Sequence, residues 1–244
     1  MTINQRKTKS CVPLKLQLCK DKQAFYFHFL KRFVRVKIAS SIGGEKFLNE
    51  VYLFINPLEQ SFIQLAPYFA YFRHIYHESS RLQVVPLVNL QVIRSYLQTR
   101  QHPLALQVQN ETLQQAYQLA LDFKAAQLQG KKCARQFLLQ MQVQMSDGYS
   151  VELANQVFQE MDADFEMFAE DREAALCKRL FRQDQQLACE MKVKNVDTLT
   201  WFNYQYDQKY GYLIEGLENI KNLPKFIQPE KSGKMTFLNL RAYK

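Results

Sequence analysis

A long part of the chain lacks the two residue types that most often end helices and build turns. Between Gly148 and Gly211 neither glycine nor proline occurs, and the whole chain of 244 residues has only seven of each. Average usage would be about 7% glycine and 5% proline. Because these are the poorest helix formers and the main turn residues, we expect many helices joined by few tight turns.

Glutamine strengthens this expectation. The chain has 28 glutamines, and twelve of them lie between Gln101 and Gln144. Glutamine is a good helix former. Hydrophobic residues make up 47% and charged residues 23% of the chain, which is typical of a globular protein and excludes wholesale disorder.

Several local signals place the helices. Asn110 is a candidate N-cap for a helix over residues 111–129, and Pro67 fits the first turn of an earlier helix. Ser150 is a candidate N-cap for an apolar pattern with helical spacing, which we expect to break near residues 170–174 or near Asp184. Residues 87–100 fit either a short helix or a strand.

Strand patterns occur near the N-terminus. Apolar and polar side chains alternate over residues 14–18 and 33–38, and residues 51–55 form an apolar run that Asn56-Pro57 ends. We predict a meander of three or four strands within residues 12–56. The rival is a helix over residues 22–38, since its aromatic residues also share a helical face.

The predicted fold class is therefore α+β: predominantly helical, with a small N-terminal antiparallel β region. Strands should concentrate before residue 57. The expected division is a basic, β-rich region over residues 1–56 and a mainly helical region over residues 57–244, which can together form one integrated domain.

One segment carries conflicting signals. Leu139 to Met145 alternates with glutamine, and Asp147-Gly148 follows, which is typical of a β-hairpin. Since glutamine and methionine favour helix, we prefer a helix before this dipeptide and a helix start after it.

Charge is unevenly distributed. Residues 1–100 carry 15 basic and 5 acidic side chains, whereas residues 101–190 carry 8 and 13. Aromatic and basic residues interleave between residues 25 and 37, as in proteins that stack bases and contact phosphates. The competing interpretation is that the aromatics are core and the cations a solvated surface. The candidate nucleic-acid-binding residues are Lys31, Arg32, Arg35, Lys37, Arg6, Lys7 and Lys9.

The leading hypothesis is thus a non-catalytic protein that binds DNA or RNA through a basic, aromatic-rich N-terminal surface. The alternative is a helical adaptor or assembly subunit that contacts protein partners through its Tyr- and Gln-rich helices. Salt-dependent binding to nucleic acid is expected under the first hypothesis and not under the second, so a binding measurement distinguishes them.

A metal-dependent nuclease is the third hypothesis. In Glu190-Met191-Lys192 the carboxylate and the amine would share one side of a strand, with Asp171 or Asp184 as the second acid. The triplet is common by chance, and it could equally end a helix. Catalysis is therefore not favoured, and no catalytic residue is assigned.

Other motifs are weak. His74 and His77 lack a third ligand for zinc, and the acidic run from Glu160 to Glu173 lacks the glycine of an EF-hand. We expect no metal site and no cofactor, since no phosphate-binding glycine loop occurs.

The cysteine pattern and hydropathy indicate a location. Five cysteines occur without a Cys-x-x-Cys motif, which favours a reducing, cytoplasmic compartment. No apolar run reaches the roughly 20 residues of a membrane-spanning helix. The cysteines are Cys11, Cys19, Cys133, Cys177 and Cys189.

Overall fold

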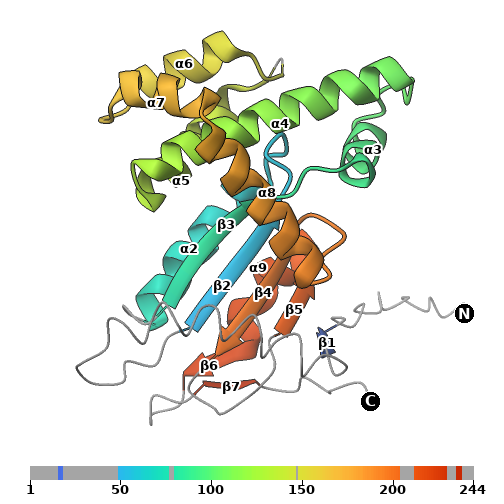
Figure 1. Ribbon diagram of the computed structural model, residues 1–244. Helices are drawn as coiled ribbons and strands as arrows, with labels where there is room; N and C mark the ends of the chain where they lie inside the picture. Colours follow the sequence, from blue (N-terminus) through green and yellow to red (C-terminus); the bar gives the residue numbers. More distant parts are fainter. Residues whose placement is uncertain are drawn as a thin grey trace, which may run out of the picture.

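The computed structural model describes residues 16–18, 49–76, 80–146, 148–203, 212–229 and 235–237 (Figure 1). Its strands are β1 (Leu16–Leu18), β2 (Asn49–Ile55), β3 (Ser80–Pro86), β4 (Thr198–Asn203), β5 (Tyr212–Glu215), β6 (Ile227–Pro229) and β7 (Met235–Phe237). Its helices are α2 (Ser61–Tyr76), α3 (Leu90–Thr99), α4 (Leu106–Leu128), α5 (Lys131–Gln144), α6 (Val151–Gln159), α7 (Phe165–Glu173), α8 (Ala175–Glu190) and α9 (Leu217–Phe226).

Five strands form a mixed central sheet in the order β1-β5-β4-β2-β3. Strands β2 and β3 are parallel and are connected by α2, whereas β4 pairs antiparallel with both β2 and β5.

The α+β, mostly helical class is confirmed. Strands are not confined to the part before residue 57, however, because β3, β4 and β5 follow it. The expected basic region and the rival helix over residues 22–38 fall almost wholly outside the described residues.

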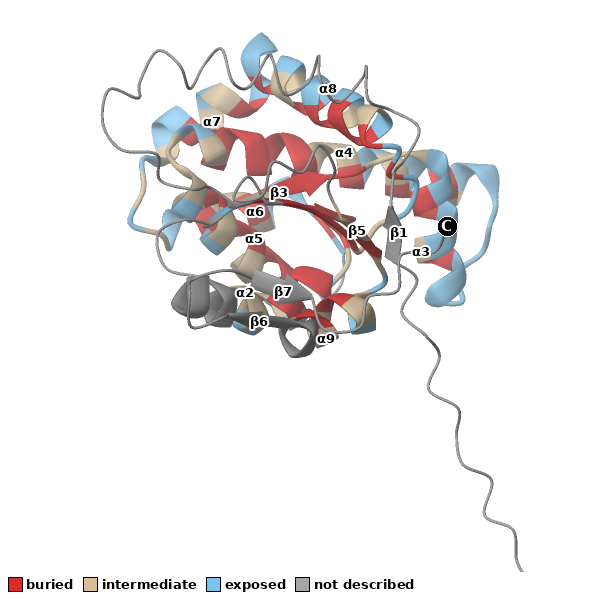
Figure 2. Cartoon of the chain, turned by 90° about the horizontal axis from the view of Figure 1, so that it is seen from below, coloured by how far each residue is buried: buried red, intermediate tan, exposed pale blue. Residues whose placement is uncertain are grey.

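Helices cover both faces of the sheet (Figure 2). Alternate residues of β2 separate into two cores: Leu53 and Ile55 pack on the side of α2 and α9, and Tyr52 and Phe54 on the side of α8. All four are at most 2% exposed. A strand buried on both faces is expected to be apolar, which explains the apolar run of residues 51–55 within β2.

Helices α3 to α8 lie between β3 and β4 in the sequence and pack beside the sheet (Figure 1). Their shared core includes the stacked rings of Phe158 and Phe168, whose centroids are 3.9 Å apart, and Phe137 tilts against both. Ser150 caps α6 as predicted, accepting a hydrogen bond from the Leu153 N–H at 3.1 Å. The expected break near residues 170–174 occurs between α7 and α8, and a second break, which the pattern did not predict, separates α6 from α7.

Two local expectations are corrected, and one open alternative, helix or strand over residues 87–100, is decided in favour of a helix. Helix α4 begins at Leu106, so Asn110 lies within it and does not cap it. Pro67 lies inside α2, six residues beyond Ser61, not in its first turn. Residues 90–99 form a helix, capped by Asn89, which accepts from the Val92 N–H at 2.9 Å. The helical interpretation of the segment around Asp147 is confirmed by α5 and α6.

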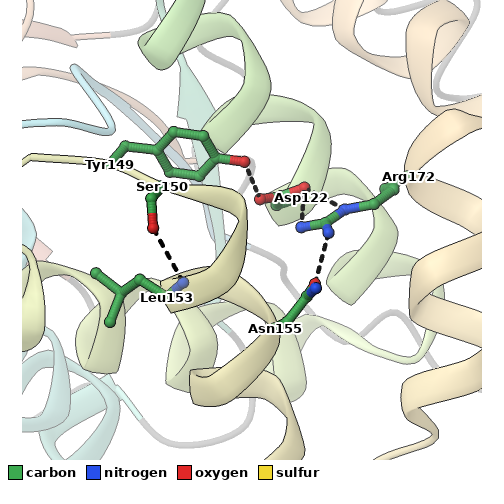
Figure 3. A network of polar contacts seen from close by, with 6 residues as sticks. All are labelled: Asp122, Tyr149, Ser150, Leu153, Asn155 and Arg172. Atoms are coloured by element: carbon green, nitrogen blue, oxygen red, sulfur yellow. Dashed lines mark hydrogen bonds and ion pairs between the residues drawn. The ribbon is translucent and has the colours of Figure 1, made fainter.

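A buried polar network joins α4, α6 and α7 (Figure 3). The Asp122 carboxylate accepts hydrogen bonds from the Tyr149 hydroxyl and the Arg172 Nε, both at 2.8 Å. Arg172 Nη1 also donates to Asn155 Oδ1 at 2.6 Å. Each charge thus has a partner, as burial in an apolar core requires.

Candidate functional site

The turn from β2 into α2 is the part of the fold where thiol chemistry would be expected. In a parallel strand–helix–strand unit, a Cys-x-x-Cys motif is typical of disulfide oxidoreductases, and a helix N-terminus lowers the pKa of a thiol. Here the turn reads Asn56-Pro57-Leu58-Glu59-Gln60, and no Cys-x-x-Cys occurs anywhere in the sequence. The position therefore cannot support dithiol exchange.

Asn56 shapes this turn. Its Oδ1 accepts a hydrogen bond from the Leu58 N–H at 3.1 Å, and its backbone carbonyl accepts from the Glu59 N–H at 3.1 Å. Asn56 is fully buried and Leu58 is 3% exposed. Glu59 and Gln60 are the first residues of the turn that reach solvent.

A glutamine from α5 closes the start of α2. Gln142 is fully buried, and its Oε1 accepts a hydrogen bond from the Ile63 N–H at 3.3 Å. Its Nε2 donates to the Pro57 carbonyl at 3.4 Å, while Gln60 donates to the Gln142 carbonyl at 3.1 Å. One of the N–H groups that a helix start leaves unpaired is thus satisfied from within the protein.

Two carboxyl groups meet beside this turn. Burial, and to a lesser extent the Asp197 carboxylate, raise the pKa of Glu59 to about 7, although the Arg100 cation acts in the opposite direction. Burial also raises the pKa of Asp197, whereas the Ser61 hydroxyl and Lys221 lower it. Around neutral pH Glu59 is therefore only partly ionised, chiefly because burial disfavours its charged form.

Backbone geometry holds Asp197 in place. Its φ of 51° lies in the left-handed region that residues with a side chain seldom adopt. Its carbonyl accepts a hydrogen bond from the Gly216 N–H at 2.8 Å, which ties the segment before β4 to the start of α9. Asn56 Nδ2, Glu59 Oε2 and Asp197 Oδ1 are all buried, and none of them has a hydrogen-bond partner among the described residues. The site thus retains polar groups that the described part of the chain does not satisfy.

The described cysteines are not arranged for disulfide exchange. Cys133 lies on α5, whereas Cys177 and Cys189 lie on α8. All three are free thiols. Burial raises the pKa of Cys133, and it raises that of Cys177 to about 11, which disfavours the reactive thiolate.

The residues singled out for nuclease chemistry are not brought together on a strand. Glu190 ends α8 and accepts a hydrogen bond from Gln186, and Lys192 follows the helix with a φ of 52°. Asp184 is buried in an ion pair with Lys124. Asp171 lies on another helix, α7. The helix-end interpretation of the triplet is therefore correct.

Over the described ranges, no group of three or more His, Cys, Asp or Glu residues is arranged to hold a metal ion. Over the same ranges, no helix combines the length and the apolar character needed to cross a bilayer. The candidate nucleic-acid-binding residues all lie outside the described residues: Lys31, Arg32, Arg35, Lys37, Arg6, Lys7 and Lys9.

Sequence reasoning missed Glu59, Asp197 and Gln142. One signal for a strand–helix turn was available: an apolar run over residues 51–55, followed by Asn56-Pro57 and then by a helical pattern. No local pattern connects that turn to residues 142 and 197, because those contacts are made only in the folded chain.

Residues 52–224 match a protein-family model described as thioredoxin. Three relatives carry the name ClpXP adapter protein SpxH. The protein from Bacillus subtilis is 32% identical over 112 residues, which are 44% of this chain and 37% of that protein. The protein from Staphylococcus saprophyticus is 23% identical over 171 residues, which are 69% of this chain and 60% of that protein. The chain thus spans about a third to three fifths of the length of these relatives.

Among solved structures, a candidate protein disulfide isomerase from Nitrosomonas europaea superposes with a TM-score of 0.51 at 12% identity. The superposition covers 73% of this chain and 96% of that one. At this identity the similarity concerns the fold alone.

These comparisons overturn the nucleic-acid-binding hypothesis. The basic residues that motivated it, from Arg6 to Lys37, precede the matched range of 52–224, and the relatives are named as adapters. Positive charge attracts any polyanion or acidic protein surface, so net charge alone did not identify the ligand. The alternative hypothesis, an adaptor that contacts proteins, agrees better with these findings.

Proposed function

This chain belongs to the thioredoxin family over residues 52–224, and from that premise we propose that it is a protein-binding adaptor that delivers a partner protein to the protease ClpXP. The proposal rests first on the turn between β2 and α2, where a family member that exchanges disulfides would need cysteines. Glu59 and the buried Gln142 occupy this region instead. A thioredoxin fold without its thiol pair can still present surfaces to other proteins.

The similarity to two ClpXP adapters supplies the specific partner class. The stretch matched to the Staphylococcus saprophyticus protein covers 69% of this chain, so it includes a large part of the folded region. An adaptor for ClpXP works inside the cell, in keeping with the cytoplasmic location expected from the cysteine pattern.

The test is a reconstituted degradation assay. Candidate clients are proteins that accumulate both in cells lacking this chain and in cells lacking ClpP. Each is purified, labelled and incubated with ClpXP, with and without the chain. We expect the chain to accelerate the degradation of at least one client, and we expect that client to bind the chain without ClpXP.

Disulfide exchange provides the contrasting measurement. We expect no reduction of insulin by the chain in the presence of dithiothreitol beyond the rate with dithiothreitol alone. The proposed function would be refuted if the chain reduced insulin as thioredoxin does. It would also be refuted if the chain left the degradation rate of every candidate client unchanged.

A further inference from the structure

Surface charge changes sign where α7 ends and α8 begins, at Ala174. The exposed glutamates of α7 recur at spacings of four and three residues, and the exposed arginines of α8 are three residues apart. Residues at these spacings lie on one side of a helix. Each helix therefore carries one charged stripe. The acidic stripe consists of Glu166, Glu170 and Glu173, and the basic stripe consists of Arg179 and Arg182.

Both stripes face away from the core. The opposite side of α7 packs on α4, where Arg172 pairs with Asp122. The opposite side of α8 packs on the same helix, where Asp184 pairs with Lys124. Figure 2 shows the exposed positions of α8 on the side away from α4. The two stripes thus belong to one outer surface, acidic along α7 and basic along α8.

The stripes are not neutralised within the described part of the chain. None of their five residues takes part in an ion pair there, whereas the buried charges of the same two helices do. Glu166 and Glu170 are four residues apart, and like charges at this spacing destabilise a helix. Glu173 is the last residue of α7, where a negative charge also opposes the helix dipole. An approaching surface of opposite charge would relieve these costs.

We propose that α7 and α8 form the contact between two copies of this chain, in which the acidic stripe of each copy lies against the basic stripe of the other. A two-fold axis brings the same surface of both copies together in opposite directions, so both acid–base contacts form at once. Two exposed apolar side chains add to this surface. Met167, which is 48% exposed, lies one turn before Glu170, and Leu176, which is 36% exposed, lies one turn before Arg179.

Charge complementarity favours a second copy over a different partner. An acidic segment attracted to the arginines of α8 would be repelled by the glutamates of α7, and a basic segment would be repelled by the arginines. The partner must therefore carry both signs, in the reverse direction and with the same separation. A second copy meets this requirement, and the inference does not depend on the proposed adaptor function.

Salt should affect the dimer in a defined way. The net charge of +9 opposes the approach of two copies. At an ionic strength of about 0.15 M the Debye length is about 8 Å, so distant charges are screened whereas stripes in direct contact still attract. At about 1 M the Debye length is about 3 Å, and the contacts are screened as well. We therefore expect a reversible dimer at the lower salt concentration and a weaker one at the higher.

The test is analytical ultracentrifugation of the whole chain over a concentration series at about 0.15 M salt. One variant reverses the acidic stripe, Glu166→Lys with Glu170→Lys, and another reverses the basic stripe, Arg179→Glu with Arg182→Glu. In either variant alone, like charges face each other, so the dissociation constant should rise at least about tenfold. In an equimolar mixture of the two variants, opposite charges meet in both contacts. We expect this mixture to form a heterodimer with nearly wild-type affinity.

Glu111→Lys with Glu218→Lys is the matched control. It changes the net charge as much as the acidic-stripe variant does, at exposed positions of α4 and α9, and should alter the dissociation constant by less than about twofold. Circular dichroism verifies folding, and glutamine substitutions at the same stripe positions replace any reversed variant that does not fold. Because association depends on concentration, stability measurements on dilute protein concern the monomer and do not involve the stripes.

Several results would overturn the proposal. The wild-type chain would remain a monomer over the whole series, or a folded stripe variant would associate as the wild type does. A mixture of the two variants that stays monomeric would show that the stripes do not face each other. Assemblies larger than a dimer would show that the contact is not two-fold, because only a two-fold contact uses both stripes of both copies and closes.

Discussion

At the scale of single residues, Glu59 makes the stability of the protein depend on pH. Its pKa is raised from 4.5 to about 7 in the folded chain. The folded state therefore holds a proton that the unfolded state has released, and the free energy of unfolding should fall as pH rises from about 4.5 to 7. We expect a loss of about 3 kcal/mol over this range, since one pKa unit corresponds to about 1.4 kcal/mol and the pKa of about 7 already includes the opposing effect of Arg100.

Urea denaturation at several pH values tests this prediction. Glu59→Gln should flatten the decline and make the protein more stable than wild type above pH 7. Glu166→Gln, which changes an exposed carboxylate of α7, should leave the profile unaltered. An unchanged slope in the Glu59 variant would assign the pH dependence to other groups.

Arg172 should be a strong determinant of stability. Its Nη2 lies 2.7 Å from Asp122 Oδ1, and the Asp122 side chain is only 1% exposed. Arg172→Met leaves that carboxylate buried without its cation, which should lower the free energy of unfolding by about 3 kcal/mol. Adding Asp122→Asn should restore part of the loss, because the unpaired charge is then absent. Denaturant titration measures both changes in the free energy of unfolding. Arg179→Met, on the exposed side of α8, is the control. If the losses caused by the two substitutions simply added in the double variant, the pairing of Arg172 with Asp122 would be contradicted.

At the scale of elements, the start of α2 depends on a residue of α5. Gln142→Ala removes the acceptor of the Ile63 N–H and the donor to the Pro57 carbonyl. We expect a loss of about 2 kcal/mol, since buried backbone groups then lack partners. Hydrogen exchange should accelerate in the first turn of α2 beyond the change elsewhere in the chain. Gln136→Ala, on the exposed side of α5, is the control, and equal exchange in the two variants would contradict the capping role.

Helix boundaries show what local sequence can predict at this scale. Ser150 was correctly predicted as a cap because its hydroxyl acts on an N–H three residues away. Asn110 has the same capping chemistry but lies inside α4, where the preceding turn of helix is already formed. Capping propensity is a local preference, and packing of the longer helix overrides it.

At the scale of the whole molecule, the sheet and the helices α3 to α8 should unfold together. One continuous core includes Leu53 and Ile55 of β2 together with Phe137 and Phe158 of the helices. The single tryptophan, Trp201, is buried in β4 and reports on the sheet, whereas far-ultraviolet circular dichroism reports mainly on the helices. We expect the two signals to have the same urea midpoint. Separate midpoints would show that the helices form an independent unit.

The sequence alone determined that the protein is mostly helical, that residues 51–55 form a strand, and that α6 begins after Ser150. Each of these depends on glycine and proline content or on contacts within a few residues, which a single sequence displays directly. Only the tertiary structure decided that Val51 pairs with Leu82 on one side and Trp201 on the other.

The candidate site was decided in the same way. Asp197 raises the pKa of Glu59, which lies 138 positions earlier in the chain, and Gln142 reaches Pro57 from α5. Such contacts form because burial of the two faces of β2 brings distant segments together, and no local propensity specifies which segments meet. Net charge, by contrast, is visible in the sequence, but it states only that anions are attracted, and the fold around the charges determines which anion can bind.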